Sequence, residues 1–206
     1  QPGRFLNAKD LGSKEDGADF QTVLIDETTN EIVVPNGTMG DRHTNPQKWN
    51  LRLENRNTGA KIDPRLSVFD QREDVTIVKL PYFGDEEHEG VIERAIPTIT
   101  VQTVDGPVKV TTVYDLILAN YGIDRGIGGE VATSYTDDTP YTPTWQEKIT
   151  GVKADIAIAT AREFADNAEK TKGRSMIIMG GGINHWYHAD IIYRTILNLI
   201  MFCGTE

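Results

Sequence analysis

Cysteine is almost absent from this sequence. Cys203 is the only cysteine in 206 residues, which excludes an internal disulfide framework and a cysteine-based zinc cluster within the chain. Cys203 itself lies in an apolar run, where a cysteine usually acts as a small hydrophobic side chain. We therefore expect it to be buried rather than reactive.

Long hydrophobic runs are also missing. The longest, residues 195–203, contains Asn198 and is about half of the roughly 20 residues that a membrane-spanning helix needs. The first residues, Gln1–Phe5, include no apolar segment of the kind found in a signal peptide. The sequence predicts neither feature within these residues.

Positive charge is in short supply. The chain has 21 Lys and Arg against 31 Asp and Glu, a formal net charge of −10. An acidic chain repels nucleic acid and anionic lipid surfaces, so we expect it to bind neither directly. The balance of 38% hydrophobic and 25% charged residues is otherwise that of a globular protein.

Both ends of the sequence look cut. There is no initiator methionine, and the last residues, Cys203–Glu206, directly follow an apolar helix-like run. Such a run would normally pack and then turn into another element. We expect an internal piece of a longer protein.

The first half, residues 1–111, has the sequence pattern of a β-rich meander, in which short β-rich runs alternate with turn residues. Asp105-Gly106 between two alternating runs is a strong hairpin signal. The predicted strands share β-branched and aromatic residues bounded by turn residues, and they are 20–25, 31–34, 50–54, 66–69, 75–78, 98–103 and 108–111.

The second half, residues 112–206, changes to a helical pattern. Thr112 with Asp115 resembles a capping box and predicts a helix over 113–120 that ends near Gly122. After a polar loop (122–140), Thr142-Pro143 starts a helix that Gly151 stops. The remaining predictions are an amphipathic helix over 155–170, a strand over 175–179, a glycine loop and a helix over 186–202. The fold class is α/β, with the β-hairpin-rich segment as an insertion on a helix–strand–glycine loop–helix segment.

The glycine loop, Gly180–Gly182, lies in the chemically densest stretch of the chain. Glycines after a buried strand let a phosphate or cofactor touch the main chain. A strained turn that binds nothing explains them equally well. The loop lacks the GxGxxG pattern and an acidic residue about 20 positions later, so it does not predict a dinucleotide site of the NAD type.

Polar and aromatic residues follow the loop. His185 and His188 are spaced for one helical face, but Asp190 does not complete a HExxH pattern, so we predict no self-contained metal site. We expect Asn184 and His185 to hydrogen-bond a ligand or the loop backbone, and Trp186 and Tyr187 to pack in a core. His43 and the acidic run Asp85–Glu89 are predicted to be solvated loops. The sequence shows no recognisable Ser/His/Asp or Cys/His arrangement for nucleophilic catalysis.

Several motifs, in order along the whole chain, resemble the alpha subunits of membrane-bound respiratory nitrate reductases, a branch of the molybdopterin oxidoreductase (DMSO reductase) family. The Asn184–His188 run is specific to this branch, and the Tyr-Thr-Pro-x-Trp and Ile-Thr-Gly elements are shared more widely. The segments that carry the resemblance are Gly3–Leu6, Pro35–Gly37, Lys48–Leu51, Pro81–Gly84, Thr111–Gly122, Tyr141–Trp145, Ile149–Gly151, Ala161–Ala168 and Gly173–His188. Family members usually show Gly-Ala-Gly where this chain has Gly180–Gly182.

This resemblance implies anaerobic nitrate respiration. It implies a molybdenum ion held by two molybdopterin guanine dinucleotides, and reduction of nitrate to nitrite by oxygen-atom transfer. It implies a [4Fe-4S] cluster whose ligands, like the aspartate ligand of molybdenum, lie outside this chain, so no residue here is assigned to a metal. Electrons would come from quinol through an iron–sulfur beta subunit and a membrane cytochrome b gamma subunit, with the enzyme peripheral on the cytoplasmic face of the cell membrane.

By the same resemblance, the loop lies against the molybdenum cofactor. The residues that it implies as cofactor contacts are Gly181, Gly182, Ile183, Asn184 and His185. His185 could donate a hydrogen bond to substrate or cofactor. Because the metal ligand lies elsewhere, we expect the isolated piece to be inactive, and the uncovered face of its last helix to favour aggregation.

Two alternatives remain open from the sequence. A nitrite oxidoreductase alpha subunit has the same architecture and runs the reaction toward nitrate, and local sequence does not decide the direction. A standalone interaction domain would fold alone and bind no cofactor.

Overall fold

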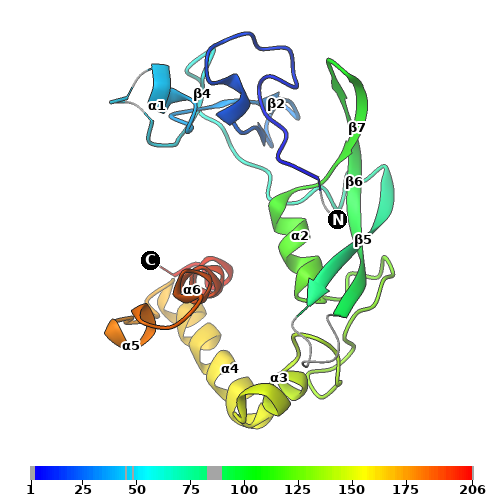
Figure 1. Cartoon of the computed structure of the whole chain (residues 1–206), viewed down its shortest axis with the longest axis vertical. Helices are drawn as coiled ribbons and strands as arrows, with labels where there is room; N and C mark the ends of the chain where they lie inside the picture. Colours follow the sequence, from blue (N-terminus) through cyan, green and yellow to red (C-terminus); the bar gives the residue numbers. More distant parts are fainter. Residues whose placement is uncertain (1–2, 45, 48, 83–89, 206) are drawn as a thin grey trace. The chain divides into compact units, whose positions relative to one another are not determined.

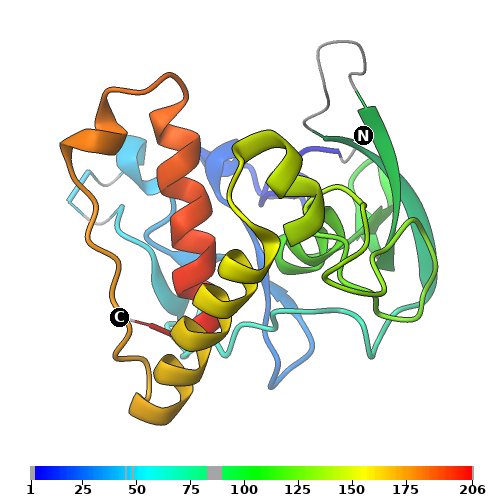
Figure 2. The same cartoon turned by 90° about the horizontal axis from the view of Figure 1, so that it is seen from below.

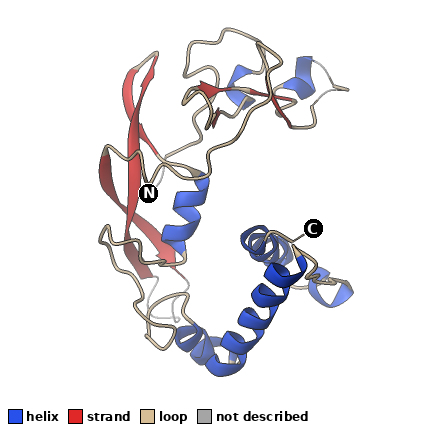
Figure 3. Cartoon of the chain, turned by 180° about the vertical axis from the view of Figure 1, so that it is seen from behind, coloured by secondary structure: helices blue, strands red, loops and turns tan. Residues whose placement is uncertain are grey.

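The structure is a computed structural model that describes residues 3–44, 46–47, 49–82 and 90–205. The chain forms two compact units, residues 1–133 and 134–206, and each is described by itself. All assigned strands belong to the first unit, and the second is built from helices and loops (Figure 3). No described helix combines the length and apolarity of a membrane span. The presence of helices and sheets confirms the predicted α/β class.

Short strands build the N-terminal part of the first unit. The pairs β1–β2 and β3–β4 are antiparallel, with Leu24 opposite Val33 in the first pair. The predicted strands at 20–25 and 31–34 are therefore confirmed as a pair, but are shorter. The elements of this part are the 3-10 helix η1 (Ala18–Phe20), β1 (Leu24–Ile25), β2 (Ile32–Val33), β3 (Pro35–Asn36), the helical turn α1 (Asp41–Thr44) and β4 (Arg52–Asn55).

A three-stranded antiparallel sheet forms the rest of the first unit, in the order β5-β6-β7 (Figure 1). Its strands are β5 (Asp74–Tyr82), β6 (Gly90–Thr103) and β7 (Gly106–Val110). The predicted hairpin joins β6 to β7, but its turn residues are Val104 and Asp105, one position before the predicted Asp105-Gly106. Gly106, the first residue of β7, has a positive φ (109°). The acidic run Asp85–Glu89 lies outside the described residues.

The helix α2 (Val113–Asn120) covers one face of this sheet. Alternate residues of β5 and β6 point to the same side, so Val78, Leu80, Ile92 and Ile96 form a core with Ala119 of α2. The predicted N-cap is confirmed, because the Thr112 side chain accepts a hydrogen bond from the Asp115 backbone N–H at 3.0 Å. The Asp115 carboxylate accepts from the Thr112 hydroxyl and not from the Thr112 backbone N–H that a capping box uses. The bounds of α2 are those the sequence predicted.

The strand predicted at 66–69 is wrong. Residues 66–69 have no strand assignment, because the backbone N–H of Val68 donates to the buried carboxylate of Asp115, at 2.9 Å, and not to a neighbouring strand. A side chain on α2 thus takes the place of a ladder partner.

Arg94 of β6 is fully buried, and a glycine-containing loop after α2 closes over it. Gly122 has φ +72°, and a Cβ placed on it would lie 2.7 Å from Nη2 of Arg94. Gly129, in the same loop, forms an isolated antiparallel β-bridge with Arg94. The loop therefore needs a glycine at position 122 for two reasons, its backbone conformation and this close approach.

Gly122→Ala is expected to lower the free energy of unfolding by about 2–4 kcal/mol, because it adds a steric clash to the cost of a left-handed alanine. Urea denaturation of the chain measures it. Gly126→Ala is the matched control: Gly126 has φ +70°, but a Cβ there meets nothing within 4 Å, so about 1–2 kcal/mol is expected. Equal losses would contradict the role given to the Arg94 contact.

The second unit contains α3 (Pro143–Thr150), α4 (Ala154–Thr171), the single turn α5 (Gly181–Asn184) and α6 (Ala189–Cys203). Thr142 caps α3 by accepting from the Trp145 N–H at 3.2 Å, and Gly151 ends it at φ 74°. Both predictions are confirmed. The helix α6 packs on α4 (Figure 2).

The predicted strand at 175–179 is also wrong, since no residue of this segment pairs with a strand. Its first residue is anchored to α4: the Ser175 hydroxyl donates to the Phe164 carbonyl at 3.0 Å and accepts from the Asn167 amide at 2.8 Å. Beyond it, Met176 and Ile178 are 74% and 87% exposed. A strand needs a neighbour to satisfy its backbone, and the described part of this unit supplies none.

The last helix begins at Ala189 and not at 186, because His188 has a left-handed backbone (φ 60°). Trp186 and Tyr187, which we expected in a core, are 70% and 88% exposed. Cys203 is half-buried and forms no disulfide. The predicted segment boundary after residue 111 stays a prediction. In the structure, α2 packs with the sheet of the first unit.

Candidate functional site

The glycine loop connects the segment that leaves α4 to the start of α6 (Figure 1). Gly180 has an extended backbone (φ −156°), and Gly181 begins the single turn α5. The three glycines, Asn184 and His185 are all exposed, and Ile183 is half-buried. The loop is thus an accessible edge of the second unit.

Neither backbone strain nor packing accounts for the three glycines. None of Gly180, Gly181 and Gly182 has a positive φ, and a Cβ on any of them would meet nothing within 4 Å. The alternative of a strained turn, which the sequence left open, therefore has no support in the geometry. Three glycines with open space around them leave the main chain accessible to a group from outside the chain.

Hydrogen-bond donors collect at this edge. No described residue accepts from the N–H of Gly181 or Gly182. Asn184 Oδ1 accepts a hydrogen bond from Tyr193 Oη of α6, and its NH₂ group donates to no described residue. The arrangement offers main-chain and amide N–H groups, which suit a ligand rich in oxygen and ring-nitrogen acceptors.

The two histidines of this stretch are both exposed. The His188 ring packs against Tyr187, with ring centroids 4.0 Å apart, and His185 is exposed at the end of α5. Among the described residues, no three His, Cys, Asp or Glu side chains are grouped as metal ligands. This edge can bind and orient a ligand through hydrogen bonds, but it supplies no ligand set for a metal.

Tyr193 is the residue at this site that sequence reasoning missed. It lies nine positions after Asn184, and only the reversal of the chain between α5 and α6 brings the two side chains together. No periodicity in the sequence predicts such a contact. The five residues predicted as cofactor contacts are contiguous, so the sequence alone already places them together. The structure adds that Gly181, Gly182, Asn184 and His185 are exposed, and shows which N–H groups have no acceptor among the described residues.

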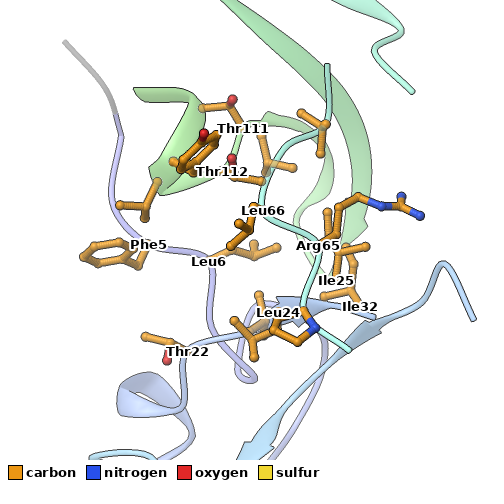
Figure 4. A pocket seen from close by; sticks show the side chains of 16 residues that line it. Phe5, Leu6, Thr22, Leu24, Ile25, Ile32, Arg65, Leu66, Thr111 and Thr112 are labelled. Atoms are coloured by element: carbon orange, nitrogen blue, oxygen red, sulfur yellow. The ribbon is translucent and has the colours of Figure 1, made fainter. Parts of the chain in front are cut away.

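A cavity of about 260 Å³ lies in the first unit (Figure 4). Its lining comes from five separate segments and is mainly apolar, with Phe5, Leu6, Leu24, Ile25 and Leu66 among the residues labelled there. The guanidinium of Arg65, which also lines it, is paired with Glu27 at 2.5 Å. The cavity carries no arrangement for acid–base or nucleophilic chemistry, so the glycine loop is the stronger candidate.

Comparisons with known proteins found no matching family model. The chain is 47% identical over 204 residues to the nitrate reductase alpha chain of Bacillus subtilis, a match that covers 99% of the chain and 16% of that protein. It is 45% identical over 215 residues to the respiratory nitrate reductase 1 alpha chain of Escherichia coli (98% and 17%). It is 44% identical over 209 residues to a nitrate reductase alpha subunit of Mycobacterium tuberculosis (99% and 17%).

A shorter match, 43% identical over 65 residues, joins 32% of the chain to the perchlorate reductase subunit alpha of Dechloromonas aromatica. The chain spans about a sixth of the length of the nitrate reductase relatives that it matches.

Proposed function

We propose that this chain is part of a catalytic alpha subunit that reduces nitrate to nitrite, since it is similar along nearly its whole length to nitrate reductase alpha chains. One observation carries the proposal: identity of 44–47% along 98–99% of the chain to relatives that bear this name. The two predicted segments, 1–111 and 112–206, would then be a β-rich insertion and part of the cofactor-binding domain of that subunit.

The glycine loop is the part of this chain that would contact the molybdenum cofactor, molybdenum held by two molybdopterin guanine dinucleotides. The residues fit such a group, because the glycine surface is open and its donors suit pterin and phosphate acceptors. Gly181, Gly182 and Ile183 would bring the main chain close to it. Asn184 and His185 would orient it by donating hydrogen bonds. When bound, the cofactor supplies the oxygen-atom transfer chemistry.

Other parts of the proposed enzyme are supplied from outside this chain. The molybdenum ligand and the ligands of a [4Fe-4S] cluster would come from the remainder of the subunit. Electrons from quinol would arrive through an iron–sulfur beta subunit and a cytochrome b gamma subunit, and the enzyme would lie at the cytoplasmic face of the cell membrane. The names of the relatives support the coarser part of this picture, a respiratory complex.

Nitrate reduction is favoured over the two alternatives by the names of the relatives, which are reductases. No observation favours nitrite oxidation. A standalone interaction domain does not account for a match to one enzyme family along nearly the whole chain.

The test is to express the full-length subunit that contains this chain with its own partner subunits. Stoichiometric molybdenum and pterin, with nitrate-dependent oxidation of a reduced viologen, is the expected result. The isolated chain, tested in parallel, is expected to retain no molybdenum and to reduce no nitrate. A full-length complex that lacks molybdenum would refute the proposal, and one that only oxidises nitrite would reverse the assigned direction.

A further inference from the structure

We propose that Tyr193 is a positioning residue, which holds the side-chain amide of Asn184 so that its NH₂ group faces the cofactor. The inference rests on the proposed function of the glycine loop. It adds a residue from α6 to that site and assigns a role to each end of the Asn184 amide.

The hydrogen bond between the two side chains defines which end of the amide points where. Tyr193 Oη donates to Asn184 Oδ1, so the oxygen of the amide is directed toward α6. The NH₂ group of an amide lies on the side opposite to this oxygen and carries two donors. It is therefore directed away from Tyr193, and no described residue accepts from it.

The surroundings of the two residues differ in a way that suits this division of roles. Tyr193 is half-buried on α6, which anchors its hydroxyl on a regular helix of 15 residues. Asn184 is exposed at the end of α5, a single turn. Without the hydroxyl, the Asn184 amide is free to rotate and to present its oxygen, an acceptor, to the oxygen acceptors of a ligand. Tyr193 thus restricts rotation of the Asn184 amide before a ligand binds, so binding loses less conformational entropy.

The two phenol groups of this stretch provide a matched pair of variants. Tyr193→Phe removes the hydroxyl that donates to Asn184 and keeps the ring. Tyr187→Phe makes the same chemical change at a ring that is 88% exposed and packs on His188. Any general effect of losing a hydroxyl near the loop will appear in both.

The experiment measures cofactor retention in the full-length subunit assembled with its partners. Molybdenum and pterin contents are determined after purification, and the rate of pterin release is followed by fluorescence in mild urea. Tyr193→Phe is expected to speed release by about 3- to 10-fold, which corresponds to one side chain left unfixed. Tyr187→Phe is expected to match the unmodified enzyme.

A second set of variants identifies the route of the effect. Asn184→Ala removes the donors, and Asn184→Asp keeps an acceptor for Tyr193 but has no NH₂ group, so both are expected to speed release by about 10-fold or more. In the Asn184→Ala background, Tyr193→Phe is expected to add nothing, because its effect acts only through the amide.

The outcomes separate the two proposals. If the Asn184 variants speed release and Tyr193→Phe does not, the positioning role is refuted while the cofactor site stands. The positioning role is also refuted if Tyr193→Phe has the same effect with and without Asn184. If neither Asn184 variant alters molybdenum content or release, the assignment of the loop to the cofactor fails.

Discussion

Under the proposed function, Gly182→Leu is expected to lower nitrate reduction by the full-length subunit about 100-fold or more, with a parallel loss of bound molybdenum and pterin. The side chain would occupy the space through which the cofactor reaches the main chain. In the chain itself the same change is expected to be nearly neutral, because Gly182 has no positive φ and a Cβ there meets nothing within 4 Å. The effect would therefore be one of binding and not of folding.

The measurements are the molybdenum and pterin contents of the purified complex, its viologen-linked nitrate reduction, and the thermal unfolding of the isolated chain. Gly3→Leu is the control, since Gly3 is also exposed and also has open space at its Cβ position. It is expected to leave all three unchanged. If Gly182→Leu retains full activity and cofactor, no group approaches the loop closely.

Asp115→Ala is expected to destabilise the first unit by about 3–5 kcal/mol, because it breaks a buried ion pair and leaves its partners unsatisfied. The Asp115 side chain is 0% exposed and paired with Arg125 at 2.5 Å. It also accepts from the Ser67 hydroxyl at 2.6 Å and the Thr112 hydroxyl at 2.7 Å. Together with the Val68 N–H, these contacts tie residues 67–68 to the start of α2.

Urea denaturation of the chain, followed by circular dichroism, measures this loss. The loss is a large share of the 5–15 kcal/mol that stabilises a typical domain. Asp155→Ala is the matched control, since Asp155 also lies in the first turn of a helix, α4, but is exposed. There the expected loss is below about 1 kcal/mol. Similar losses at both positions would show that the buried hydrogen bonds and ion pair of Asp115 contribute little to the free energy of unfolding.

Helix ends were predictable because their signals are local. Thr112 with Asp115 defines the start of α2, and Thr142-Pro143 with Gly151 defines both ends of α3. In each case the capping group and the N–H that it binds are three residues apart, so the interaction can be read from spacing alone. The hairpin between β6 and β7 was predicted from local sequence in the same way, although its turn lies one position before Asp105-Gly106.

Extended segments were predicted less well, because a strand depends on partners that are distant in sequence. Residues 66–69 and 175–179 both have strand-like composition. The first is held by Asp115, 47 positions away. The second is anchored at Ser175 and pairs with no strand in the part of the chain that the structure describes. Exposed Trp186 and Tyr187 show the same dependence, because burial is decided by what else packs nearby.

The sequence by itself determined the α/β class, the ends of the capped helices, the hairpin turn, the absence of a disulfide framework and the family resemblance, because each is encoded by residue type and short spacing. Only the tertiary structure decided that the glycines at 180–182 are free of strain and packing, and that Tyr193 reaches Asn184. It also decided that Asp115 replaces a strand partner for Val68. These features arise when segments far apart in the chain, or separated by a reversal, come into contact, and no local pattern specifies such contacts.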